Sequence, residues 1–215
     1  MDGYSLTRDL ASYYDQEASS RDTWKRDDHL VAGRRDLCAR MRVERRTRLL
    51  EIGCGTGRDA REFLASGIPT VTGVDLSSAS CRIAQGHGVD ALSASVLALP
   101  FAADSFDACW TISTLIHVAD ESWLEMCREL QRVLVDGSPV VVGVWGSGSD
   151  RDDNGVQHTD TIEPKRVFHR RSDANLRRLM DQIGTIEAFA TWRYEGSMRP
   201  YQFSTVRIRT ASRSA

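Results

Sequence analysis

Residues 48–60, RLLEIGCGTGRDA, combine the signal of a buried strand with a glycine-rich turn. The apolar run ends in three glycines at alternate positions, Gly53, Gly55 and Gly57, and RDAREFLASG after the turn has a helical pattern. Glycine lets a backbone bend tightly and approach a ligand closely, and the start of a helix presents free N–H groups. The stretch therefore predicts a strand, a turn and a helix that together form a ligand-binding edge.

The alternation of strand and helix continues along the chain. Apolar runs typical of strands occur at 70–75, 90–95, 106–113, 138–145, 185–194 and 201–209. Stretches typical of helices occur at 5–45, 77–88, 121–134 and 172–183. This order favours a parallel sheet with helices on both faces, and wholly apolar runs fit strands that are buried on both sides. Residues 146–166, rich in Gly, Ser and Asp, are predicted to form a long loop.

The composition fits one compact domain with a substantial core, since 41% of the 215 residues are hydrophobic and the formal net charge is −2. No run of 18 apolar residues occurs, which excludes a typical membrane span. The N-terminal segment is acidic and polar, so we expect no signal peptide and a cytoplasmic location. The five cysteines show no CxxC spacing, so we predict no disulfide framework and no metal site, and most should be small buried residues.

Three ligand classes use a glycine-rich turn between a strand and a helix: a nucleotide phosphate, a nicotinamide dinucleotide and S-adenosylmethionine (SAM). A phosphate-binding loop needs Lys and then Ser or Thr after its last glycine, whereas this chain has Arg-Asp there. The dinucleotide fingerprint GxGxxG fits only from Gly55 to Ala60, and it leaves Gly53 and Glu51 unexplained. The pattern acidic-x-Gly-x-Gly-x-Gly, which starts at Glu51, favours SAM.

With this pattern the chain resembles the class I SAM-dependent methyltransferases, and the resemblance continues in order through residues 47–145. VTGVDLS, LALPFAADSFDACWTISTLIHV and ELQRVLVDGSPVVVGVW are similar to later motifs of the type 11 subgroup, which includes ubiquinone and menaquinone methyltransferases. The resemblance implies an α/β, Rossmann-like, seven-stranded sheet of order 3-2-1-4-5-7-6, with strand 7 antiparallel and helices on both faces. It also implies SAM as the cofactor and S-adenosylhomocysteine (SAH) as the product. We expect a helical cap at 1–46 and the methyltransferase domain at 47–215, as a single globular unit.

The resemblance also implies which residues bind the cofactor. They are Glu51, Gly53, Gly55, Gly57, Asp75, Leu76, Ser95, Val96, Thr111 and Tyr14. Asp75 would accept hydrogen bonds from both ribose hydroxyls, and its charge strengthens such bonds. A side chain at Gly55 or Gly57 would occupy ligand volume. Ser95 stands where many relatives have Asp, so its contact to the adenine amine would be uncharged.

The other positions divide between the two ends of the ligand. Leu76 would pack on the adenine and the backbone of Val96 would contact it. Glu51 would meet the ligand's ammonium group directly or through water, and the backbone near Thr111 would accept from the same group. A tyrosine of the N-terminal helix, one of Tyr4, Tyr13 and Tyr14, would close over the methionine carboxylate.

Methyl transfer needs an aligned nucleophile, and a base only where the acceptor is a hydroxyl or a protonated amine. His117 is the candidate catalytic base, because it follows the fourth strand and a neutral imidazole suits pH 7; the alternative is a hydrogen-bonded structural histidine.

The flanking segments predict the class of acceptor. Residues 1–45 and 146–170 remain to enclose it, which favours transfer to an O, N or C nucleophile of a small-molecule metabolite in a biosynthetic pathway. Candidate lining residues are Trp110, Trp145, Phe168 and Arg199. The alternatives are a tRNA methyltransferase of wobble-uridine type, with the arginines of 34–48 facing phosphates, and a catalytically silent SAM-binding protein. The net charge argues against a nucleic-acid partner, and we expect a monomer or homodimer with no membrane partner.

Overall fold

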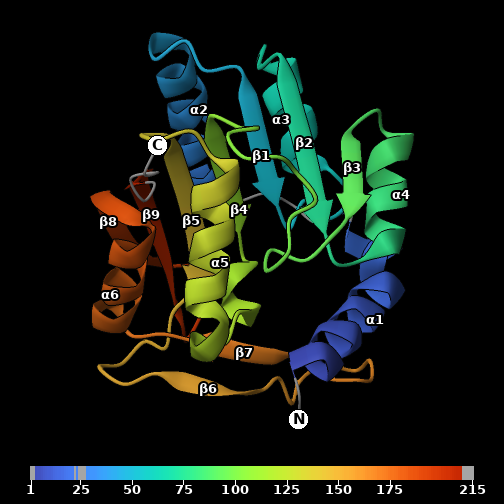
Figure 1. The fold of residues 1–215 in the computed structure, drawn as a ribbon. Coiled ribbons are helices and arrows are strands. Elements are labelled where there is room, and N and C mark those ends of the chain that lie inside the picture. Colours follow the sequence, from blue (N-terminus) through green and yellow to red (C-terminus); the bar gives the residue numbers. More distant parts are fainter. Residues whose placement is uncertain (1–2, 22, 24–27, 210–215) are drawn as a thin grey trace. The chain divides into compact units, whose positions relative to one another are not determined.

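The computed structural model describes residues 3–21, 23 and 28–209 (Figure 1). These residues form two compact units. The first comprises the described residues as far as Ser95 together with His158–Arg166, and the second comprises Val96–Gln157 and the described residues from Val167 onward.

The first unit contains three parallel strands, which are β1 (Arg48–Ile52), β2 (Thr70–Asp75) and β3 (Asp90–Ser93). Its helices are α1 (Gly3–Arg21), α2 (Asp28–Val43), α3 (Arg58–Ala65) and α4 (Ser78–Gly86). The helical segment expected at 5–45 is therefore two helices, and residues 22 and 24–27 between them lie outside the described residues. α4 packs beside β3, and α1 packs against α4 (Figure 1).

Local sequence signals explain the ends of these elements. β1 buries Leu49, Leu50 and Ile52, as its apolar run predicts. α4 begins after Ser77, whose Oγ accepts a hydrogen bond from the backbone N–H of Ser80 at 3.0 Å and so caps the helix. All five cysteines are buried and free, which confirms that they act as small core residues.

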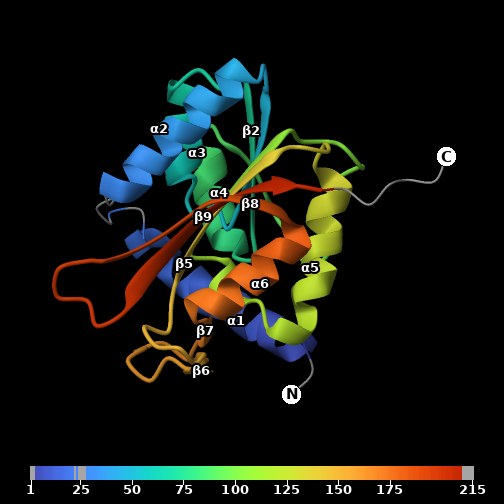
Figure 2. The ribbon, with the colours of Figure 1, turned by 90° about the vertical axis from the view of Figure 1, so that its left-hand side faces the viewer.

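The second unit contains the remaining strands and helices. Its strands are β4 (Ala108–Ile112), β5 (Pro139–Trp145), β6 (Asp153–Val156), β7 (Val167–Arg170), β8 (Gly184–Arg193) and β9 (Pro200–Ile208). Its helices are the 3-10 turn η1 (Leu115–His117), α5 (Asp120–Val133) and α6 (Asp173–Ile183). β4 and β5 are parallel, and β9 lies antiparallel between β5 and β8, with α6 packed on β8 and β9 (Figure 2).

The seven-stranded sheet has the order β3-β2-β1-β4-β5-β9-β8. With the β6–β7 pair set aside, β8 and β9 are the sixth and seventh strands, so the predicted order 3-2-1-4-5-7-6 is confirmed. The antiparallel seventh strand is confirmed as well. The fold is therefore α/β and Rossmann-like.

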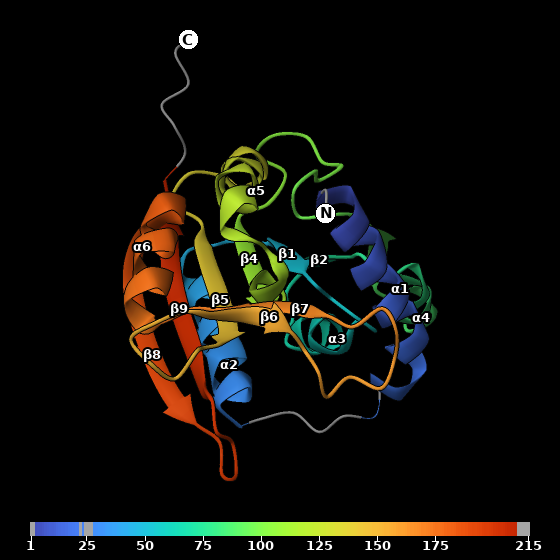
Figure 3. The same ribbon diagram turned by 90° about the horizontal axis from the view of Figure 1, so that it is seen from below.

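The segment predicted as a loop contains a small sheet of its own. β6 and β7 pair antiparallel, with Asn154 opposite His169, and lie side by side (Figure 3). β7 also packs against η1. Each strand has only four residues, and β6 is the polar sequence Asp-Asn-Gly-Val. The loop prediction was wrong here, because pairing with a distant partner supplies the hydrogen bonds that the local composition does not signal.

A buried ion pair joins α2 to α3. Arg34 Nη1 lies 2.8 Å from Asp59 Oδ1, and the two side chains are 9% and 2% exposed. Arg34 Nη2 also lies 3.5 Å from Glu62 Oε2. Charges removed from water are tolerated only when they are paired, so this contact is expected to matter for stability.

We expect Arg34→Ala to lower the free energy of unfolding by about 3–5 kcal/mol, because it removes the cation beside a buried carboxylate. The matched control is Arg35→Ala at the adjacent exposed position, which should change stability by about 0.5 kcal/mol or less. Urea unfolding of both variants measures the difference. Equal effects in the two variants would contradict the role of the pair.

Candidate cofactor-binding site

The glycine turn after β1 depends on left-handed backbone conformations. Gly53, Gly55 and Gly57 have φ values of 73°, 52° and 77°, which side-chain-bearing residues rarely adopt. The backbone N–H groups of Gly53 and Cys54 both donate to the carbonyl of Val74, at 2.8 and 3.0 Å. The turn is thereby fixed to the end of β2, one residue before Asp75.

The Asp75 carboxylate forms the centre of the site. Its Oδ2 accepts from the backbone N–H of Gly55 at 2.9 Å, and its Oδ1 accepts from the backbone N–H of Ser77 at 2.8 Å. Burial raises the pKa of the Asp75 carboxyl, while these two hydrogen bonds act in the opposite direction. One carboxylate thus links the glycine turn to the start of α4.

The two later glycines have different surroundings. A Cβ added at Gly55 would meet nothing within 4 Å, so this position faces open space. A Cβ added at Gly57 would lie 3.0 Å from Ala84 Cβ and 3.0 Å from Val89 Cγ2. Gly55 therefore fits a turn that a ligand approaches closely. The expectation that a side chain at Gly57 would fill ligand volume was wrong, because Ala84 of α4 and Val89 occupy that space.

Helix α1 reaches the same place through Asp15. Its Oδ1 accepts from Ser77 Oγ at 2.7 Å and from the backbone N–H of Ala79 at 2.9 Å. Asp15 therefore adds a carboxylate to the N-terminus of α4, where the helix dipole favours negative charge. Asp15 directly follows Tyr14 in the sequence and was not among the predicted site residues.

The two tyrosines before Asp15 differ in exposure. Tyr13 is 2% exposed and donates to Glu17 Oε1 at 2.8 Å, as a packed residue does. Tyr14 is half-buried, and burial raises the pKa of its hydroxyl. The side chain of Tyr4 lies outside the described residues. Tyr14 is therefore the described tyrosine that suits a ligand contact.

The remaining predicted residues of the first unit lie along the strand ends. Glu51 is buried, in register with Gly73 of β2. Leu76 is half-buried after Asp75, and its carbonyl accepts from Ser93 Oγ at 3.1 Å. Ser95 is half-buried two residues after β3.

Three predicted residues belong to the second unit. Val96 is its first residue and is half-buried. Thr111 lies in β4, fully buried, and its Oγ1 has no hydrogen-bond partner among the described residues. His117 ends η1, with Nδ1 3.0 Å from the Val167 carbonyl and its ring centroid 5.0 Å from that of Phe168. Donation from Nδ1 to this carbonyl makes Nε2 the basic nitrogen of the neutral ring.

The candidate lining residues of the acceptor site differ in their burial and in their contacts. Trp110 is fully buried beside Phe203 and belongs to the core. Trp145 is half-buried among Tyr194 and Tyr201. Arg199 Nη2 lies 2.5 Å from Asp153 Oδ2, and Arg199 Nη1 donates to the Ser147 carbonyl at 3.1 Å.

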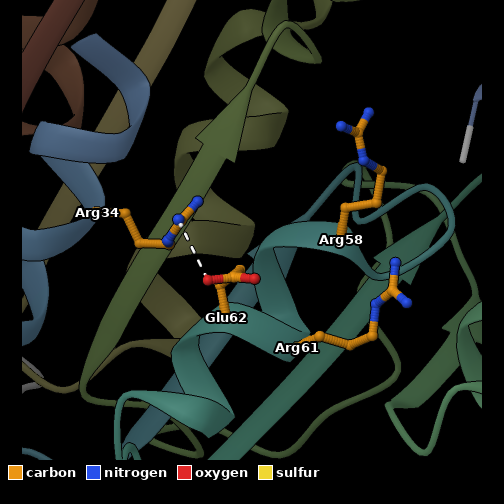
Figure 4. Close-up of a pocket in the computed structure, with 4 residues that line it drawn as sticks. All are labelled: Arg34, Arg58, Arg61 and Glu62. Carbon is orange, nitrogen blue, oxygen red and sulfur yellow. Dashed lines mark ion pairs between the residues drawn. The ribbon is translucent and has the colours of Figure 1, made fainter. Parts of the chain in front are cut away.

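A basic hollow of about 420 Å³ lies between α2 and α3 (Figure 4). Its lining residues are Arg34, Arg58, Arg61 and Glu62. Arg34 carries the ion pair with Glu62 that the figure marks, and Arg58 donates to the Arg21 carbonyl at 3.2 Å. Both contacts lie within the protein, so the hollow is a poor candidate for a phosphate-binding surface.

No group of three or more His, Cys, Asp or Glu residues with the geometry of a metal site occurs in the described part of the chain. Among the same residues, none of the helices has the length and hydrophobicity needed to cross a membrane.

Comparisons with known proteins agree with this geometry. A family model described as a methyltransferase domain matches residues 49–137. Uncharacterized protein MJ1123 of Methanocaldococcus jannaschii is 32% identical over 162 residues, which cover 75% of this chain and 72% of that protein. O-methyltransferase rstn1 of Aspergillus nomiae is 30% identical over 116 residues, covering 50% of this chain and 51% of that protein. This chain therefore spans about half the length of the second relative.

Several solved structures resemble nearly the whole chain. Among them is 1,6-didemethyltoxoflavin-N1-methyltransferase of Burkholderia thailandensis, with 1,6-didemethyltoxoflavin and S-adenosylhomocysteine bound. The TM-score is 0.74 at 19% identity, and the match covers 98% of this chain and 92% of that one. A likeness at this identity supports the fold.

We expect Gly55→Val to abolish SAM binding, because a branched side chain would enter the open space above the turn. The matched control is Gly67→Val after α3, since Gly67 also has a positive φ (85°) and nothing within 4 Å of an added Cβ. Both variants bear a similar backbone cost of about 1–2 kcal/mol. Calorimetric titration with SAM and thermal melting separate the two effects. Wild-type affinity in Gly55→Val would show that the ligand does not approach this turn.

Proposed function

Because residues 49–137 match a methyltransferase domain, we propose that the chain is a class I SAM-dependent methyltransferase that transfers a methyl group from SAM to an O, N or C nucleophile of a small-molecule metabolite. We place it in the type 11 subgroup and in a biosynthetic pathway in the cytoplasm. The observation that carries the proposal is the hydrogen bond from Gly55 to Asp75, which holds a carboxylate beside an open glycine turn.

The residues of the first unit fit the cofactor. Asp75 accepts from two backbone N–H groups and retains lone pairs on both oxygens for the ribose hydroxyls. Leu76 would pack against the adenine, and Ser95 would contact its edge. The backbone of Val96, which belongs to the second unit, would contact the adenine as well. When bound, SAM would supply a methyl group on a sulfonium sulfur, and the neutral thioether SAH would be the leaving group.

The amino-acid tail of the cofactor meets the other predicted residues. Glu51 would meet the ammonium group, directly or through water, and the backbone near Thr111 would accept a hydrogen bond from the same group. The Tyr14 hydroxyl would donate a hydrogen bond to the carboxylate. Gly53 and Gly57 maintain the turn rather than touch a polar group of the ligand.

His117 is the proposed general base for a hydroxyl or protonated amine acceptor. The contact with the Val167 carbonyl holds its Nδ1 as the donor, so Nε2 takes the proton. Acceptors that are already nucleophilic at pH 7 need only alignment, which enclosure provides.

Enclosure by the flanking segments supports a small acceptor. In the first unit, residues 158–166 pack on α1, where Gln16 Nε2 donates to the Glu163 carbonyl at 3.1 Å. We therefore keep residues 1–46 as a cap on the methyltransferase domain of 47–215. The proposed assembly is a monomer or homodimer.

The pairing of the arginines in 34–48 argues against the tRNA alternative. Arg34 pairs with Asp59, while Arg40 and Arg46 both pair with Glu44. Arg42 donates to the Ser66 carbonyl. The three ion pairs offset part of the positive charge that a phosphate backbone would require, whereas Arg42 keeps its charge.

Incubation with methyl-labelled SAM and a fractionated metabolite extract tests the function directly. We expect label in a small organic-soluble or polar metabolite, and less activity with His117→Gln at unchanged SAM affinity if the acceptor is a hydroxyl. Bulk tRNA is the parallel substrate. Label in tRNA alone would establish the runner-up, and SAM binding without any labelled product would favour the catalytically silent alternative.

A further inference from the structure

Arg166, which no motif singled out, lies against the paired tyrosines of α1. Its Cζ is 4.4 Å from the ring centroid of Tyr13 and 5.6 Å from that of Tyr14. Its Nη1 donates to the Tyr14 hydroxyl at 3.3 Å. The guanidinium therefore contacts both aromatic faces and the one polar atom that the site would use.

Asp160 holds this guanidinium in place. Arg166 donates from Nε to Asp160 Oδ2 at 2.9 Å and from Nη2 to Oδ1 at 2.6 Å, which is the bidentate geometry that only arginine provides. The backbone N–H of Arg166 donates to Oδ2 as well, at 3.1 Å. The side chains are 14% and 3% exposed. Although burial acts to raise it, these hydrogen bonds keep the pKa of Asp160 below its usual range.

The Tyr14 side chain is also fixed from other directions. Arg21 Cζ lies 4.6 Å from the Tyr14 ring centroid. The next residue, Asp15, is hydrogen-bonded to Ser77 and to Ala79. Tyr14 is therefore positioned one residue from a contact that leads through Ser77 to Asp75.

The direction of the hydrogen bond decides what Tyr14 can do. A hydroxyl that accepts from a guanidinium directs its own proton toward another acceptor, and the adjacent positive charge makes that O–H a stronger donor. The partner best suited to such a donor is an anionic oxygen. SAM and SAH carry one at the carboxylate of their amino-acid tail.

We propose that Arg166 is a positioning residue for the cofactor: held by Asp160, it orients the Tyr14 hydroxyl to donate to the carboxylate of the amino-acid tail of SAM. This rests on the proposed function, because it assumes that SAM binds beside Asp75. It extends that function by giving residues 158–166 a part in recognising one end of the ligand.

The test compares two ligands that differ in that tail. SAH has the carboxylate, whereas 5′-methylthioadenosine keeps the adenosine and lacks the amino-acid group. In Arg166→Gln we expect the Kd for SAH to rise about tenfold, the scale of one hydrogen bond to a charged group, and the Kd for methylthioadenosine to stay unchanged. Tyr14→Phe should give the same pattern. Combining the two changes should weaken SAH binding no further, since they act through one contact.

Three further variants keep the result interpretable. Arg166→Gln combined with Asp160→Asn removes both charges and protects the fold if the single change is unstable. Arg166→Lys keeps the charge but loses the two-pronged geometry, so it should recover only part of the affinity. Lys165→Gln removes a neighbouring charge that pairs with Glu163 at 3.7 Å, and it should match the wild type.

Equal weakening of both ligands would reduce Arg166 to a structural role, and unchanged SAH binding would remove it from the site; either result overturns the inference. Failure of the wild-type protein to bind SAH would instead refute the proposed function.

Discussion

The carboxylate of Asp75 is the contact on which the candidate site depends. It receives the backbone N–H of Gly55 from the glycine turn and that of Ser77 from the start of α4. Ser77 in turn donates its hydroxyl to Asp15 of α1. Three segments distant in the sequence thus meet around one charged group. Contacts within the protein that fix the polar groups of a site lower the cost of ordering them when a ligand binds.

Much of the fold was predictable because the strongest signals are local. Short stretches of sequence are enough to recognise the apolar runs of β1, β2, β4 and β5 and the periodic apolar face of α5. The strand order came from the resemblance rather than from periodicity, and the observed order agrees with it. The pair β6–β7 was not predicted because each four-residue strand is stabilised by a partner beyond residues 157–166, in a segment whose composition is typical of loops.

The site was predictable only where backbone geometry demands particular residues. Gly55 has a positive φ and open space where a side chain would lie, so the glycine pattern correctly predicted a position with room for a ligand. Gly57 gives the same signal for another reason, which is the close approach of Ala84 and Val89 to the turn at this position. The role of Arg166 could not be predicted, because it depends on contacts with Asp160 and with tyrosines about 150 positions away in the sequence. A single sequence does not record such pairings.

The most direct measurement is a crystal structure of the full chain with SAH. We predict that both ribose hydroxyls lie within hydrogen-bond distance of the Asp75 carboxylate. We also predict that the ligand passes over Gly55, where no side chain intervenes. The Gly55–Asp75 hydrogen bond should persist in the complex. Density for SAH elsewhere, for example in the hollow lined by Arg58 and Arg61, with the turn and Asp75 unoccupied, would contradict the assignment of the cofactor site.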